Sequence, residues 1–445
     1  MMTHSSSSQD YEFRLLGQLE HILESDTLID EVGFVHPTQL VALKEEAGSS
    51  INHVSSSQQS EHNMFMTDPF SHDGTIFWNQ EHKLAISTEV IFPLYNAAKN
   101  AFLASVEQYK MLINLPAKTD NSVAETVQDQ HLASKHFLES EVMKHSKALL
   151  LLSCDFGTAW NSRKLVVLQE ILSLFMDELK LSALILSYSP KSDHAWSHRR
   201  WVIKSIAGKC PNLQEIVVKE SELVEKIAER SKMNYRAWHH RCWLVSYMTK
   251  DQVLDEFNKS RKWAELHIAD NCCFQYRKRL MLRMLEDICL NQENDLCSSN
   301  MMGLYKIWKE ELDWDEMLIK RYIGREALWV HRRFLSQYWV KHFVSNIQYT
   351  PCHSEDDHSK NRDMYIFMDN EVELLHTCLA VLDDDFEDGQ AQVTFVAAYV
   401  FWMSKQIPHS QRTELEEKLK RIGDLRDLLN KVDPAKAQLW NGLMS

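Results

Sequence analysis

Apolar residues recur along most of the chain at the three- and four-residue spacing of a helix that is buried on one face. The first run has leucine or isoleucine at positions 15, 16, 19, 22 and 23. A long helical segment is predicted from about 82 to 113, and the pattern is almost continuously helical over 137–345. Two or three more helices are predicted within 364–445. The pattern therefore predicts an all-α protein.

Polar stretches divide this pattern. The serine-rich residues 1–10 are predicted to be a disordered tail, and 11–130 a helical region with polar loops at 47–63 and 116–130. Further breaks fall near 290–303, in the acidic loop 349–363 and in the acidic turn 383–388. We expect these parts to form one continuous domain.

One short motif repeats: a tryptophan is followed three positions later by an arginine. The pairs are Trp160 and Arg163, Trp196 and Arg199, Trp238 and Arg241, and Trp329 and Arg332, and a weaker copy, FQYRKRL, places Tyr276 and Arg279 at the same offset. The steps between the aromatic positions are 36, 42, 38 and 53 residues. A step near 40 fits one helical hairpin, so the motif predicts stacked antiparallel hairpins over 137–345.

Helix boundaries around the motif support the hairpins. Pro190 ends the helix before it, because proline cannot continue a helix. Ser192 or Asp193 can cap the next helix. Gly324 can end the helix before the last copy.

The recurrence of the pair indicates a structural role. Residues i and i+3 share a helix face, so Trp238 and Arg241 point the same way. The indole can fill the gap between hairpins, and the arginine can bond a carbonyl or an acid of its neighbour. Contact with a ligand is the alternative. We favour the structural role, because the signature of a repeat normally maintains the stack.

Composition agrees with helices and narrows the function. Glycine (11) and proline (9), which break helices, are scarce. The net charge of −14 argues against a nucleic-acid binder. Nine cysteines without a C-x-x-C spacing indicate reduced thiols in a cytoplasmic protein. The apolar run 393–403 is too short for stable membrane insertion.

No self-sufficient active site is apparent. His194 and His198 have i, i+4 spacing, but no third ligand accompanies them, so no metal site is predicted. Cys272 and Cys273 lack a basic context that would activate a thiol, and we expect them in a core or an interface. No phosphate-binding glycine loop or serine-nucleophile motif is present.

The two best copies resemble the repeats of protein prenyltransferase α-subunits. They are PKSDHAWSHRRW (190–201) and NYRAWHHRCW (234–243), and the resemblance covers roughly 148–345. Flanking segments are similar to the divergent branch of the family that supplies the α-subunit of the third type (type III) of protein geranylgeranyltransferase. These segments are LIDEVGF (28–34), HKLAISTEVIFPLYNAAK (82–99), KWAELHIADNCCFQYR (262–277) and EALWVHRRF (326–334).

The resemblance implies a fold and a function. The fold would be a right-handed superhelix, a crescent-shaped α–α solenoid of antiparallel hairpins. The chain would form a heterodimer with a catalytic β-subunit, expected to be of the Rab type, which holds the zinc and most of the isoprenoid pocket. Geranylgeranyl diphosphate would be the co-substrate and proteins with C-terminal cysteines the acceptors. The chain itself would bind no cofactor.

The resemblance also implies one residue near the chemistry. A family lysine approaches the prenyl diphosphate, and Lys191 stands at the matching position. Asp193 replaces the tyrosine that the family has two positions later, and an acid there would be unfavourable unless it turns away, for example as a helix cap. We expect Tyr235, His198, His239 and His240 on the concave face that meets the partner.

Two alternatives stay open. A non-enzymatic helical-repeat scaffold would keep the repeats without a β-subunit. An RNA-binding helical repeat would need a basic stripe and would bind more weakly at high salt.

Overall fold

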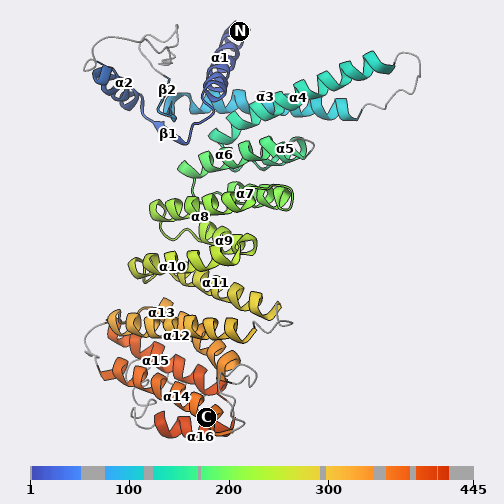
Figure 1. The fold of residues 1–445 in the computed structure, drawn as a ribbon. Helices are drawn as coiled ribbons and strands as arrows, with labels where there is room; N and C mark the ends of the chain where they lie inside the picture. Colours follow the sequence, from blue (N-terminus) through green and yellow to red (C-terminus); the bar gives the residue numbers. More distant parts are fainter. Residues whose placement is uncertain are drawn as a thin grey trace. The chain divides into compact units, whose positions relative to one another are not determined.

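The computed structural model describes residues 3–51, 76–114, 124–168, 172–290, 297–344, 357–380, 387–407 and 409–419 (Figure 1). The chain divides into two compact units, residues 1–240 and 241–445, and the division falls within one helix. Helices make up most of both units, which confirms the all-α prediction as a fold class. The prediction of one continuous domain stays a prediction.

The first unit begins with a helix, a small sheet and two long helices, followed by the first hairpins. Its elements are α1 (Thr3–Ser25), β1 (Glu31–Val35), α2 (Pro37–Ile51), β2 (Phe77–Gln80), β3 (Lys83–Ser87), η1 (Thr88–Val90), α3 (Ile91–Ile113), α4 (Ala124–Leu152), α5 (Gly157–Val167), α6 (Leu172–Tyr188), α7 (Asp193–Ile206), α8 (Leu213–Arg230) and the first part of α9 (Tyr235–Leu244).

The second unit continues the hairpins from the rest of α9. Its elements are η2 (Val245–Tyr247), α10 (Lys250–Leu266), α11 (Asn271–Leu290), α12 (Cys297–Arg321), α13 (Glu326–Trp339), η3 (Val340–Val344), α14 (Asp357–Ala380), α15 (Glu387–Gln406) and α16 (His409–Leu419). Within the described residues, no helix is both long enough and apolar enough to cross a membrane.

The three-stranded sheet was not predicted from the sequence. Its order is β1–β3–β2, with β1 parallel and β2 antiparallel to β3. Glu81 and His82 form the turn between β2 and β3 with φ values of 48° and 62°, the left-handed conformation of a tight hairpin turn. The helix predicted from about 82 therefore starts only at Ile91. Glu81–His82 lacks the Asn-Gly type of sequence that normally marks such a turn.

Other boundaries also differ from the prediction. The tail predicted at 1–10 is wrong from residue 3 onward, because α1 begins at Thr3. The predicted loop at 47–63 overlaps α2, which continues to Ile51, and the loop at 116–130 overlaps α4, which begins at Ala124. Similarly, α14 begins at Asp357, inside the predicted acidic loop. The remaining parts of these loops lie outside the described residues.

The predicted hairpins and their local boundaries are confirmed. Each tryptophan–arginine pair lies on the second helix of a hairpin, and consecutive hairpins α6–α7 and α8–α9 follow one another in the first unit (Figure 1). The helix α6 ends at Tyr188, just before Pro190, and the Ser192 side chain caps α7 by accepting from Ala195 N at 3.3 Å. Gly324, with φ of +70°, follows the end of α12.

Candidate functional site

The N-terminal ends of α7 and α9 bring together the exposed polar residues of the two best motif copies. The loop that carries Lys191 is held by the carbonyl of Pro190, which accepts from Trp196 Nε1 at 3.0 Å and from Asn234 Nδ2 at 2.7 Å. Both donors are buried. Asn234 also caps α9, because its Oδ1 accepts from Ala237 N at 3.1 Å. The backbone next to Lys191 is therefore fixed by two neighbouring hairpins.

Lys191 itself is exposed on this fixed loop. Asp193, two positions later, accepts two hydrogen bonds from Arg236 at the start of α9, one of them from Nη2 at 2.7 Å. The Arg236 hydrogen bond and charge lower the pKa of Asp193, so this carboxylate stays ionised and paired. Asp193 is thus turned toward Arg236, and the helix cap comes from Ser192 instead.

Tyr235 completes the exposed part of this end of α9. Its side chain is 61% exposed, next to Met233 at 53%. His239 is exposed as well. Large apolar side chains at this exposure, beside the ion pair of Asp193 and Arg236, make the ends of α7 and α9 a candidate contact surface for another protein.

Two of the four predicted partner contacts are wrong. His198 and His240 have no exposed surface and cannot contact a partner, because each lies against a tryptophan of the preceding copy. The ring centroids of His198 and Trp160 are 4.6 Å apart, and those of His240 and Trp196 are 5.0 Å apart. Both imidazoles bond a buried glutamate, described next.

The signature arginine of the second copy, Arg199, connects its own hairpin to the next one. Arg199 of α7 donates from Nη1 to Leu179 O at 2.5 Å and to Ser182 Oγ at 2.9 Å, both on α6. It also donates from Nε to Glu220 Oε2 on α8 at 3.0 Å. Glu220 accepts a further hydrogen bond from His240 Nε2 at 3.0 Å. All these side chains are buried, so a charged pair is satisfied inside the core.

Among the described residues, a buried glutamate accepts from an arginine and from a histidine or tyrosine five times, and we call these sets the arginine–glutamate networks. Two lie within residues 1–240 and three within 241–445. They are Arg163–Glu178–His198, Arg199–Glu220–His240, Arg241–Glu256–Tyr276, Arg277–Glu311–His331 and Arg332–Glu371–Tyr399. The signature residues are thus part of the core, as the structural interpretation of the repeat requires.

The fourth copy corrects the sequence register. The predicted pair was Tyr276 and Arg279, but Arg279 is partly exposed and bonds Glu286 at 2.9 Å. Arg277 is fully buried and makes the network contacts, donating to Glu311 at 2.8 Å. Phe274 therefore stands at the tryptophan position, and Tyr276 takes the place that histidine has in other copies.

Burial and neighbouring charges set the protonation states of the glutamates and histidines in the networks. Burial alone would raise the pKa of Glu178, but the Arg163 guanidinium and the hydrogen bond from His198 outweigh it and lower the pKa to about 2. Burial lowers the pKa of His198, and its Nδ1 has no hydrogen-bond partner among the described residues. His198 is therefore a neutral imidazole that donates from Nε2 to Glu178 at 2.7 Å.

The candidate thiols and metal ligands carry no reactive arrangement. Burial raises the pKa of Cys272 and of Cys273 to about 12, so both remain thiols at neutral pH. In the described part of the chain, no three His, Cys, Asp or Glu side chains are placed to hold a metal ion. The exposed ends of α7 and α9 thus remain the best candidate for function.

Comparison with known proteins concerns these same hairpins. The family model for the protein prenyltransferase alpha subunit repeat matches residues 175–206, which span α6 and α7, and residues 218–248, which span α8, α9 and η2. Two hairpins of the chain are thus similar to protein prenyltransferase alpha subunit repeats. In these repeats, Lys191 and Arg236 lie at the starts of successive second helices.

Full-length relatives show the same resemblance. The chain is 30% identical over 245 residues to human protein prenyltransferase alpha subunit repeat-containing protein 1, which covers 46% of this chain and 60% of the relative. The zebrafish (Danio rerio) protein of that name is 30% identical over 242 residues, 46% of this chain and 57% of the relative. The chain thus spans less than two thirds of these relatives. Geranylgeranyl transferase type-2 subunit alpha of Saccharomyces cerevisiae is 27% identical over 154 residues, 33% of this chain and 46% of that protein.

Sequence reasoning missed two residues of this site, the buried Asn234 and the exposed Arg236. It also missed that the histidines are buried partners of the glutamates, although a recurring sequence position indicates this. The residue two positions after the first aromatic residue is histidine or tyrosine in AWSHR, AWHHR, FQYR and WVHR. That regularity marks the buried partner of the glutamate.

Proposed function

We propose that this chain is the α-subunit of a heterodimeric protein prenyltransferase that transfers geranylgeranyl to C-terminal cysteines of protein substrates. The observation that carries the proposal is Lys191, an exposed cation on a loop fixed by Pro190 and Asn234, within the two hairpins that match the prenyltransferase repeat. A rigidly placed cation suits the stabilisation of a departing diphosphate.

An unpaired Asp193 carboxylate would repel a diphosphate bound next to Lys191. Its pairing with Arg236 offsets that charge, because the two groups together are neutral and Lys191 then adds a positive charge. The pair also holds the start of α7 to the start of α9. We therefore assign Asp193 and Arg236 a supporting role for Lys191 at the interface.

A catalytic β-subunit completes the proposed enzyme. It would be of the type that serves geranylgeranyl transferase type 2, hold the zinc and most of the isoprenoid pocket, and accept geranylgeranyl diphosphate. The exposed Tyr235 and Met233 would contact it. The interface should be of the obligate kind, burying more than about 2,000 Å². The enzyme would act in the cytoplasm.

The test is co-expression with that β-subunit, size-exclusion chromatography and a zinc-dependent geranylgeranyl transfer assay on cytosolic proteins. A one-to-one complex with transfer activity is expected. Lys191→Ala should lower kcat/KM by about tenfold or more while leaving the complex intact. Lys204→Ala, which removes an exposed lysine from the other end of α7, is the matched control and should change neither. Equal activity of both variants would refute the role of Lys191.

A non-enzymatic scaffold is the second candidate, favoured by the replacement of the family tyrosine by Asp193. It predicts a stable monomer that binds no prenyltransferase β-subunit and supports no transfer.

A further inference from the structure

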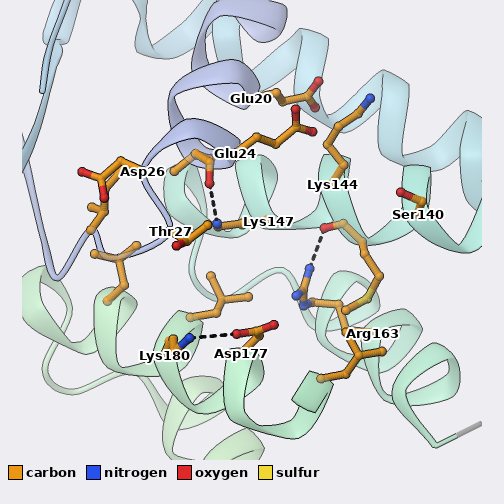
Figure 2. Close-up of a pocket in the computed structure, with 16 residues that line it drawn as sticks. Glu20, Glu24, Asp26, Thr27, Ser140, Lys144, Lys147, Arg163, Asp177 and Lys180 are labelled. Atoms are coloured by element: carbon orange, nitrogen blue, oxygen red, sulfur yellow. Dashed lines mark hydrogen bonds and ion pairs between the residues drawn. The ribbon is translucent and has the colours of Figure 1, made fainter. Parts of the chain in front are cut away.

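A cavity of about 300 Å³ lies in the first unit, away from the exposed ends of α7 and α9. It is bounded by the end of α1, the turn after it, α4 and α6 (Figure 2). Its apolar lining comes from Leu23, Ile29, Met143, Leu174, Leu181 and Leu184. The volume is at the lower end of the range for small-molecule sites. The cavity can therefore hold a compact ligand with an apolar part.

Lys147 of α4 is the cation inside this cavity. Its Nζ donates to Leu23 O at 3.0 Å, and Figure 2 shows the side chain extending toward Thr27. An ammonium group has three N–H donors, so two remain for other acceptors. No carboxylate oxygen of the described residues lies within 4.0 Å of this nitrogen. Burial lowers the pKa of Lys147, and the nearby Arg163 charge adds to that effect.

Most of the other charged groups that line the cavity have partners of their own. Among the acids, Asp177 bonds Lys180 at 3.1 Å, Glu20 bonds His145 at 2.6 Å and Asp26 bonds His82 at 2.9 Å. Among the cations, Lys144 bonds Glu141 at 2.7 Å and Arg163 bonds Glu178 at 2.5 Å. Glu24 is exposed at the rim. Lys147 is thus a partly buried cation among groups that are mostly paired, and the charges of Asp177 and Glu24 partly offset the lowering of its pKa.

We propose that this cavity binds a small organic anion, a carboxylate or a phosphate monoester with a short apolar tail, and that Lys147 is its counter-ion. A buried charge is costly unless it is paired and hydrogen-bonded. An anion would supply both, because two N–H donors of Lys147 are available for charge-assisted hydrogen bonds. The leucine, isoleucine and methionine side chains would cover the tail. In Figure 2, Lys144 lies above and Lys180 below Lys147, and each is paired with a carboxylate.

The proposal is tested by calorimetric titration of the full chain with three probes: hexanoate, propyl phosphate and 1-hexanol. At least one of the two anions should bind, and the neutral alcohol should not. The anion that binds more tightly identifies the head group. Failure of both anions to bind, or equal binding of 1-hexanol, would overturn the proposal. Prenyl transfer is not the readout, so this outcome is independent of the proposed function.

Two variants test the role of Lys147. Lys147→Met should weaken binding of the preferred anion by at least about tenfold, the loss expected for a buried charge-assisted contact. Should this variant fold poorly, Lys147→Gln, which keeps a donor but no charge, should show the same loss. Lys164→Met is the matched control, because burial also lowers the pKa of Lys164 but this side chain does not line the cavity. Unchanged binding in both Lys147 variants would refute the assignment.

Discussion

Asp315 of α12, beside Arg332, is a buried acid that the surrounding core does not satisfy. Its side chain is fully buried, neither oxygen has a hydrogen-bond partner among the described residues, and Arg332 Nη1 is 3.8 Å away. Three other networks have serine at this place, seventeen residues before the arginine. Ser146, Ser182 and Ser260 each accept from the arginine Nη1 at 2.8 to 2.9 Å. We expect Asp315→Ser to stabilise the protein.

Two contributions set the magnitude. Burial raises the pKa of Asp315 well above its usual range, and the carboxylates of Glu311 and Glu371 raise it further against the opposing charge of Arg332. The folded state therefore keeps this proton while the unfolded state releases it. Each pH unit between the unfolded-state and folded-state pKa costs about 1.4 kcal/mol of stability. A serine that accepts from Arg332 would add about 1.5 to 3 kcal/mol.

The assay is urea denaturation, followed by tryptophan fluorescence, at several pH values from 4 to 8. Because the pKa of Asp315 is raised on folding, its unfavourable contribution grows as the pH rises. The advantage of Asp315→Ser should therefore grow with pH and be at least about 2 kcal/mol at pH 7. Asp315→Asn should show the same pH trend without the full hydrogen-bond gain.

The converse substitution is the control. Ser260→Asp places an acid beside Arg277 in the network of α10 and α11, where Nη1 now bonds the serine at 2.9 Å. This variant should lose stability at neutral pH. An advantage of Asp315→Ser that is equal at all pH values, or a loss of stability at pH 7, would refute the reasoning.

Three further predictions concern other parts of the structure. Arg199→Ala leaves Glu220 buried and without its ion pair, so the free energy of unfolding should fall by about 3 to 5 kcal/mol in a denaturation series. A loss under about 1 kcal/mol would contradict this. Residue 324 has a φ of +70°, and Gly324→Ala would place a Cβ 2.6 Å from Asp388 O. The melting midpoint should therefore fall by several degrees. An unchanged midpoint would show that the backbone there can shift. The pKa of Glu178 and of Glu220 is about 2, so the stability that these carboxylates supply is present above pH 4.5 and should decline as the pH falls toward 2. An acid titration followed by circular dichroism would detect this loss, and a flat profile would contradict it.

Local features could be predicted from the sequence because they depend on neighbouring residues only. Pro190 after α6, the Ser192 cap and the left-handed Gly324 follow from backbone preferences at single positions. The tryptophan and arginine positions could be predicted too, because repetition shows which residues keep a common role.

The register of the fourth copy could not be decided in the same way. The stretch FQYRKRL offers two aromatic residues and two arginines that both fit the three-residue offset, Phe274 with Arg277 and Tyr276 with Arg279. Only the buried partner Glu311, thirty-four residues away, distinguishes them. A contact at that separation depends on how the hairpins stack, which the local pattern does not contain.

Burial of the histidines was missed for a related reason. His239 and His240 are adjacent, and neighbours on a helix point in different directions, so only one can face the core. The lysine site remains a prediction, because Lys191 is exposed and only a partner could show its role. The hydrogen bond beside it, from Asn234 to the Pro190 carbonyl, joins residues that are 44 positions apart in the sequence.

The networks also indicate where this chain can change in length. Within a hairpin, the carbonyl that accepts from the arginine is twenty residues before it at Arg163, Arg199, Arg277 and Arg332. Between hairpins, the arginine and its glutamate are 15, 21, 15, 34 and 39 residues apart. An insertion inside a hairpin would shift the arginine relative to its carbonyl acceptor and to its glutamate. An insertion between hairpins leaves both contacts in place. Lineages of this protein should therefore differ in length at the connections between hairpins, and an engineered tag or domain would be tolerated at the same points.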